Sequence, residues 1–129
     1  MNIYAIGDIH GCSKQLTLLL DKIFDKYKFD NKNDLLIFLG DYIDRGPNPK
    51  GVIDQLINLN QRNIKSVFLL GNHEQIINDF LFNKINNLRE WIYYGADQTF
   101  RSYNIEITEY IKEGFEDDNI DKLRSTFLN

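Results

Sequence analysis

Three short apolar segments, each ended by glycine and polar residues, constrain the fold of this chain more than any other feature. They are IYAI (3–6), LLIFL (35–39) and VFLL (67–70). Continuous apolar runs of this length are typical of parallel strands that are buried on both faces. Segments of helical length separate them. This alternation predicts an α/β fold in which right-handed crossovers join parallel strands.

The segments between and after the strands carry helical patterns. The first follows Gly11, with Ser13 as the expected N-cap, and the second starts at Pro49. Their apolar residues recur at helical spacing: Leu16, Leu19, Leu20, Ile23 and Phe24, then Val52, Ile53, Leu56, Ile57 and Leu59. Beyond Gly71 we expect helices at roughly 74–83, 87–93, 96–103 and 119–128. We therefore read 1–129 as a single domain with a β-α-β-α-β core (1–74) and a mainly helical segment (75–129).

Composition limits the class of protein. A chain of 129 residues is long enough for one domain with a proper core. Its net charge of −4 argues against a general nucleic-acid or anionic-membrane surface. The single cysteine, Cys12, excludes an intrachain disulfide and suits a reducing compartment. Neither a signal peptide nor a membrane span is recognisable. We expect a cytoplasmic protein without a membrane partner, and the oligomeric state stays open.

Polar motifs follow each of the three predicted strands. They are GDIHG (7–11), GDYIDRG (40–46) and GNHE (71–74). Ligands of open α/β sheets bind beyond the carboxyl ends of the strands, so neighbouring parallel strands would bring the three loops together. Both histidines of the chain lie in these loops. The gathered side chains would be Asp8, His10, Asp41, Asp44, Arg45, Asn72 and His73.

Part of this set is suited to hold metal ions. Asp8 and His10 are one residue apart, so on an extended backbone both side chains leave on the same face. Asp41 has two carboxylate oxygens and could bridge two ions, and Asn72 offers an amide oxygen. Mixed oxygen and nitrogen ligands fit Mn, Fe, Zn or a similar divalent ion. Two such ions about 3.5–4 Å apart can activate water and assist an in-line displacement at phosphorus.

The remaining residues are suited to bind phosphate and to move a proton. The planar guanidinium of Arg45 matches phosphate oxygens, and His73 is a candidate general acid that Asp44 could orient. Each motif alone also has an ordinary structural interpretation, such as a turn, a capped helix start or a loop ion pair. The three motifs together, each directly after a strand, favour a phosphoesterase site. We expect Cys12 and Trp91 to be structural.

These motifs resemble those of the calcineurin-like metallophosphoesterases. More narrowly, they are similar to the phosphoprotein-phosphatase (serine/threonine phosphatase) branch, with its bacterial and phage members and the symmetrical dinucleoside-tetraphosphatases. The stretch WIYYGADQTFRSY (91–103) also resembles these members, with Ala96 in place of a usual glycine. The resemblance extends from Ile3 to about Tyr103. It implies the N-terminal part of an α/β/β/α sandwich.

The resemblance assigns roles to the same side chains. Asp8 and His10 would hold the first metal, Asp41 would bridge, and Asn72 would hold the second. His73 with Asp44 would form the acid pair. Arg45 would bind the phosphate of the substrate.

The resemblance implies further ligands that this sequence lacks. Family members supply two more histidines and an arginine from strands further downstream, whereas no histidine follows His73. We therefore expect a C-terminally truncated chain without the second β-layer, an incomplete second metal site and at most weak activity.

The expected function is metal-dependent hydrolysis of phosphate monoesters in phosphoproteins or small esters, by attack of metal-activated water. Two alternatives remain open. The substrate could be a dinucleoside polyphosphate, or the chain could be a non-catalytic domain that binds one metal ion or a phosphate group.

Overall fold

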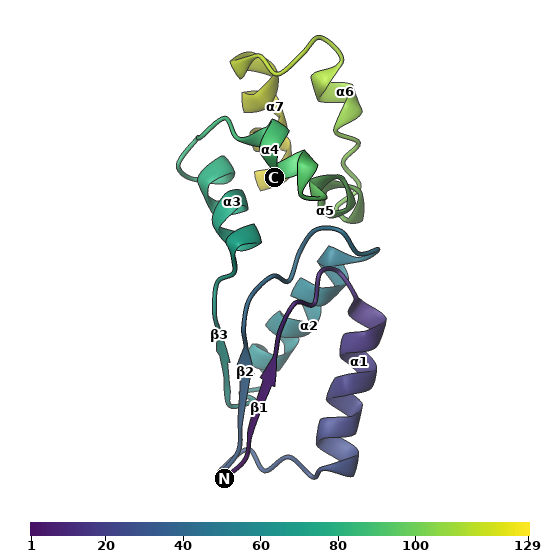
Figure 1. Ribbon diagram of the computed structural model, residues 1–129, viewed down its shortest axis with the longest axis vertical. Coiled ribbons are helices and arrows are strands. Elements are labelled where there is room, and N and C mark those ends of the chain that lie inside the picture. The colour runs from purple at the N-terminus through teal and green to yellow at the C-terminus, as the bar shows by residue number, and fades with distance from the viewer.

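The computed structural model describes residues 1–129 and is built on a three-stranded parallel sheet (Figure 1). The strands β1 (Ile3–Ile6), β2 (Leu35–Phe38) and β3 (Ser66–Phe68) are hydrogen-bonded in the order β1-β2-β3. Ile3 pairs with Leu35 at one end of the sheet, and Phe38 pairs with Phe68 at the other. The predicted α/β class is confirmed, and the three strands are parallel neighbours.

Two helices cover one face of this sheet. They are α1 (Ser13–Asp21), which continues into the π-helical turn η1 (Lys22–Lys26), and α2 (Pro49–Gln61) (Figure 1). Pro49 occupies the first turn of α2, and the Asn48 side chain caps it by accepting from the Gly51 N–H at 2.9 Å. The prediction of Ser13 as N-cap was wrong by one residue, because Cys12 holds that position. The Ser13 hydroxyl instead accepts from the Asn48 amide nitrogen at 3.1 Å, which links the starts of both helices.

The other face of the sheet is open, as expected for a chain without the second β-layer, although the apolar runs alone had suggested strands buried on both faces. Phe38 is fully buried against the helices, while Ile3, Leu39, Val67 and Leu69 on the opposite face are 42–54% exposed. The continuous apolar runs were interpreted correctly as two apolar faces. Both crossover helices lie on the same side, however, and no other segment of the chain reaches the second face.

Five further helices gather beyond the carboxyl ends of the strands (Figure 1). They are α3 (Asn72–Leu81), α4 (Leu88–Tyr93), α5 (Ala96–Ser102), α6 (Thr108–Ile111) and α7 (Asp117–Leu128). Four of these were predicted with boundaries within two residues. The short helix α6 was not, because four residues are too few to show a helical period. None of the helices combines the length and the apolar content needed to cross a bilayer.

Aromatic rings and one buried arginine hold these helices together. Trp91 of α4 packs between Phe80 of α3 and Phe100 of α5, with ring centroids 5.5 and 4.9 Å away. Arg124 of α7 donates to the carbonyl oxygens of Phe80 at 2.6 Å and Ile85 at 2.9 Å. These bonds satisfy the buried guanidinium and fix α7 against the end of α3.

The two faces of the sheet should respond differently to the loss of a side chain. Phe38→Ala should reduce the free energy of unfolding by about 3–5 kcal/mol, because it removes a fully buried ring. Leu39→Ala, on the open face, should cost at most about 1 kcal/mol. Urea unfolding of both variants measures the difference. A comparable loss at Leu39 would show that the open face is covered in solution.

Candidate active site at the ends of the strands

The loops after β1 and β2 are joined backbone to backbone. The His10 N–H donates to the Asp41 carbonyl at 2.9 Å, and the Gly11 N–H donates to the Tyr42 carbonyl at 2.8 Å. The chains approach so closely that a Cβ atom at Gly46 would overlap the His10 carbonyl oxygen. Only glycine fits there. The sequence GDYIDRG thus places its second glycine where the two loops touch.

Glu74 attaches the third loop to this pair. Its buried carboxylate accepts from the N–H groups of Asp41 at 2.7 Å, Tyr42 at 2.8 Å and Gly71 at 2.9 Å. Gly71 is required here too, because a Cβ atom would overlap the Asp41 carboxylate. One side chain at the start of α3 therefore sets the position of Asp41 relative to Asn72 and His73.

The side chain of Tyr42 links the ends of the two strands beneath these loops, β2 and β3. Its hydroxyl donates to the Leu69 carbonyl at 2.6 Å and contacts the Phe38 carbonyl at 3.2 Å, so it joins the ends of β2 and β3. Burial, with the nearby charge of Glu74, raises the pKa of Tyr42 to about 12. The phenol therefore keeps its proton, and its hydrogen bond, across the physiological pH range.

Asp44 and His73 form a buried pair. Their side chains are 0% and 2% exposed, and Nδ1 of His73 lies 2.6 Å from Oδ2 of Asp44. A carboxylate can only accept, so Nδ1 carries the hydrogen and the other ring nitrogen, Nε2, makes no hydrogen bond within the chain. This is the arrangement of a general acid or base held by an orienting carboxylate.

His10 is held in a similar way by backbone. Its Nδ1 lies 2.8 Å from the Ile43 carbonyl oxygen, which also fixes a hydrogen on Nδ1 and leaves Nε2 as a free acceptor. Metal-binding histidines commonly donate their second ring nitrogen in this manner. The rings of His10 and His73 meet edge to face with centroids 4.6 Å apart. Both histidines of the chain thus lie in one place.

Asp41 lies beside the start of α3. Its Oδ1 accepts from the His73 N–H at 3.2 Å, and the side-chain amide of Asn72 lies 3.1 and 3.3 Å from its two oxygens. With the amide nitrogen toward Asp41, these contacts are hydrogen bonds. With the amide oxygen toward it, two acceptors face each other as ligands of a shared cation do.

Asp8 and Arg45, like Asn72, are exposed, whereas Asp44 and His73 are buried. Neither the Asp8 nor the Arg45 side chain makes a hydrogen bond or ion pair within the chain, so both are free to contact a ligand. Asp8 lines a cavity of about 250 Å³ that also includes Cys12, Leu16 and Leu19. Arg45 is anchored only by its backbone, whose N–H donates to the Gly95 carbonyl at 3.1 Å.

The donors at this edge have the chemistry of ligands for a divalent metal ion. Carboxylate, imidazole and amide ligands are combined, and the free Nε2 of His10 has the lone pair that a metal requires. No group of three or more His, Cys, Asp or Glu side chains is arranged to hold an ion by itself. Asn72 or ligands outside this chain would have to complete the coordination.

Five of the predicted site residues have left-handed backbone. The φ angles are 50° at Asp8, 40° at His10, 55° at Asp41, 69° at Asp44 and 66° at Arg45. This conformation is uncommon outside glycine and costs on the order of 1–3 kcal/mol per residue. Such a concentration is typical of functional sites, where the surrounding structure imposes a side-chain direction.

Three residues of the site were not predicted to belong to it. Trp91 was expected to be structural, and neither Glu74 nor Thr99 was singled out. Trp91 Nε1 donates to Asp44 at 2.8 Å, and the Thr99 hydroxyl donates to it at 2.6 Å. The polar motif WIYYGADQT was the available signal, since a buried indole N–H needs an acceptor.

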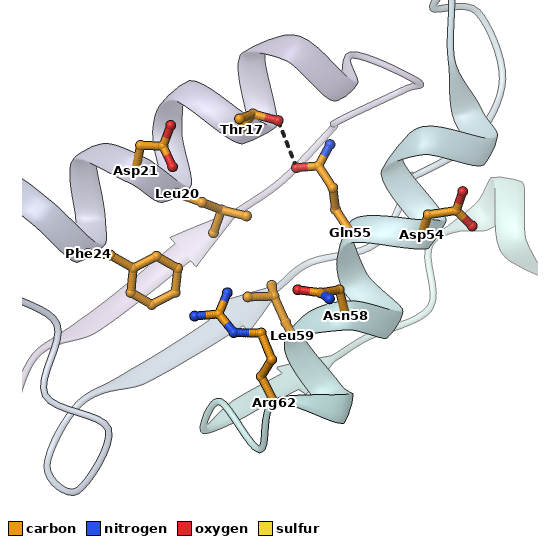
Figure 2. Close-up of a pocket in the computed structure, with 9 residues that line it drawn as sticks. All are labelled: Thr17, Leu20, Asp21, Phe24, Asp54, Gln55, Asn58, Leu59 and Arg62. Carbon is orange, nitrogen blue, oxygen red and sulfur yellow. Dashed lines mark hydrogen bonds between the residues drawn. The ribbon is translucent and has the colours of Figure 1, made fainter.

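The groove between α1 and α2 is separate from this site (Figure 2). Its volume is about 360 Å³, and Leu20, Phe24 and Leu59 point into it. Thr17 and Gln55 are bonded to each other across it at 3.1 Å. None of its lining residues comes from the three loops, so it has no part in the chemistry described above.

Comparison with known proteins agrees with this arrangement. Residues 1–127 match the family model of the calcineurin-like phosphoesterases. A symmetrical bis(5'-nucleosyl)-tetraphosphatase of Buchnera aphidicola subsp. Schizaphis graminum is 47% identical over 57% of this chain and 24% of its own length. One from Wigglesworthia glossinidia brevipalpis is 43% identical over 70% and 30%. Serine/threonine-protein phosphatase 1 of Salmonella typhimurium is 34% identical over 74% and 39%. The chain thus spans less than two fifths of the length of these relatives.

Glu74 provides a direct test of how the loops are held. Glu74→Gln keeps the size of the side chain but turns one acceptor oxygen into an NH₂ group that faces a backbone N–H. We expect the free energy of unfolding to fall by about 1–3 kcal/mol. Glu90→Gln, at an exposed residue without a hydrogen-bond partner, is the matched control and should change it by less than about 0.5 kcal/mol. Equal urea midpoints for the two variants would contradict this account.

Proposed function

The chain belongs to the calcineurin-like phosphoesterase family, and on this basis we propose that it hydrolyses P–O bonds of phosphate esters or anhydrides at the edge where the three loops meet. The observation that supports this most is the buried Asp44–His73 pair. Its hydrogen bond is 2.6 Å long and leaves the second imidazole nitrogen of His73 without a hydrogen bond, while the backbone N–H of His73 donates to the Asp41 carboxylate.

In this proposal an exposed residue binds the phosphate and a buried pair transfers the proton. Arg45, exposed and without an internal partner, binds the phosphate oxygens through its planar guanidinium. His73 gives a proton from Nε2 to the leaving oxygen, while Asp44 balances the charge of the protonated ring. Burial of the pair keeps competing water away from Nδ1, so the proton is exchanged only at Nε2.

Members of this family generally depend on two metal ions. In this chain Asp8, His10 and Asp41 would contribute ligands to one, and Asp41 with Asn72 to the other, and ligands outside this chain would have to complete the coordination. When bound, such ions activate a water molecule and stabilise charge on phosphorus oxygens. Which metals bind, whether Mn or another divalent ion, stays a prediction, as does the cytoplasmic location.

Two substrate classes follow from the relatives. The tetraphosphatases, at 47% and 43% identity, favour a dinucleoside polyphosphate as the first substrate to test. The serine/threonine phosphatase, which matches more of this chain at lower identity, favours a phosphorylated protein or small phosphate monoester as the second. Both require the same phosphate-binding arginine and the same proton donor.

Turnover by the purified chain tests the proposal. Diadenosine tetraphosphate, a phosphoserine peptide and 4-nitrophenyl phosphate are assayed with Mn²⁺ and with a chelator. We expect turnover that requires the metal and falls about 10²–10⁴-fold in His73→Asn, the range for loss of a general acid. Gln75→Asn, at an exposed position of α3, is the control. If metal or phosphate binds without any metal-dependent turnover, the chain is a non-catalytic binding domain.

Arg45 should show a conflict between stability and function. Arg45→Gly relieves a left-handed backbone, so thermal stability should rise by up to about 1 kcal/mol. The same change should weaken inhibition by inorganic phosphate by roughly 1.5–3 kcal/mol, through loss of a charged contact. Arg45→Ala, which keeps the strain, should weaken phosphate binding equally without the gain in stability. Unchanged phosphate inhibition in both variants would remove Arg45 from the site.

A further inference from the structure

We propose that Trp91 and Thr99 are positioning residues that hold the Asp44 carboxylate so that it presents His73 as a single tautomer. The proposal rests on the proposed role of His73 as proton donor. It assigns a function to the helices α4 and α5, which contribute none of the residues of the three loops.

The contacts of Asp44 account for its whole carboxylate. Oδ1 accepts from the Thr99 hydroxyl at 2.6 Å, while Oδ2 accepts from Trp91 Nε1 at 2.8 Å and from His73 Nδ1 at 2.6 Å. The Thr99 oxygen also accepts from the Asp44 N–H at 2.9 Å. Thr99 therefore fixes both the backbone and the side chain of one residue. With the group fully buried, no water replaces a missing donor at low cost.

The supporting residues lie at regular intervals along two short helices. Trp91 is in α4, Thr99 is in α5, and Gly95 between them accepts from the Arg45 N–H at 3.1 Å. Positions 91, 95 and 99 thus contact consecutive residues of the loop after β2. The neighbouring core residue Phe100 packs against Trp91 with a side chain that has no polar atom. Packing alone therefore does not require an indole or a hydroxyl at these two positions.

Removing one donor should loosen the pair. Without Trp91 Nε1 or the Thr99 hydroxyl, the carboxylate is free to rotate about its side-chain bonds, and His73 loses the fixed acceptor for Nδ1–H. The neutral ring would then distribute between its two tautomers. His10 supplies an internal reference, because its Nδ1 is fixed by the Ile43 carbonyl and not by Asp44.

Nuclear magnetic resonance can read both rings, since the chain contains only these two histidines. Long-range ¹H–¹⁵N spectra of the metal-free chain should show His10 and His73 both as the Nδ1–H tautomer. In Trp91→Phe and in Thr99→Val we expect His73 to become a mixture while His10 does not change. Phe100→Leu, a packing change beside Trp91, should leave both rings as they were. His73 held as Nδ1–H in both variants, with dispersed spectra that prove folding, would overturn the proposal.

Activity provides the second measurement. A proton donor matters most for poor leaving groups, so both variants should lose on the order of tenfold more kcat on phenyl phosphate than on 2,4-dinitrophenyl phosphate. The KM values should change little, and Phe100→Leu should affect both substrates equally. If His73 becomes a mixture of tautomers but kcat falls equally on both substrates, Trp91 and Thr99 do position His73, and the proposal that His73 donates the proton is wrong. Equal losses with an unchanged tautomer would show that Trp91 and Thr99 serve only packing.

Discussion

The carboxylate of Glu74 is the interaction on which the arrangement of the three loops depends. The loops after β2 and β3 turn sharply and so leave backbone N–H groups that no strand or helix can satisfy. Glu74 accepts three of them at 2.7–2.9 Å and is itself buried. With those groups satisfied, Asp41 can adopt its left-handed backbone and lie against Asn72 and His73. The hydrogen bonds of Glu74 thus offset the backbone strain at Asp41.

Much of the fold could be predicted from the sequence because the signals are local. Apolar runs ended by glycine located the strands, and helical spacing located six of the helices. What failed depended on information that single segments do not contain. Ser13 was assigned as a cap from residue type, whereas its hydroxyl is used by Asn48, 35 positions away. The apolar pattern is also the same for a covered and an uncovered face of the sheet, so the open face was expected only from the missing second β-layer and not from the strands themselves.

The candidate site shows the same division. The placement of the three loops could be predicted, because residues that follow neighbouring parallel strands share one edge of the sheet and because three polar motifs occur together there. The supporting layer could not, since Trp91 and Thr99 reach Asp44 across 47 and 55 positions of chain. Trp91 was interpreted as core, and it is in the core. The sequence could not indicate that its one polar atom is aimed at a carboxylate.

Asp44 therefore connects the two parts of the chain in a single group. From the sheet side it orients His73, and from the helical side it receives Trp91 and Thr99. A buried carboxylate with fewer donors would be costly, and a buried indole or hydroxyl without an acceptor would be costly as well. The helices α4 and α5 thus supply hydrogen-bond donors to the buried Asp44 carboxylate, and Asp44 supplies the acceptor that the buried Trp91 N–H and Thr99 hydroxyl need. The helices α4 and α5 are held over the loops by the same hydrogen bonds that set the direction of His73, so in this region stability and the proposed chemistry depend on the same atoms.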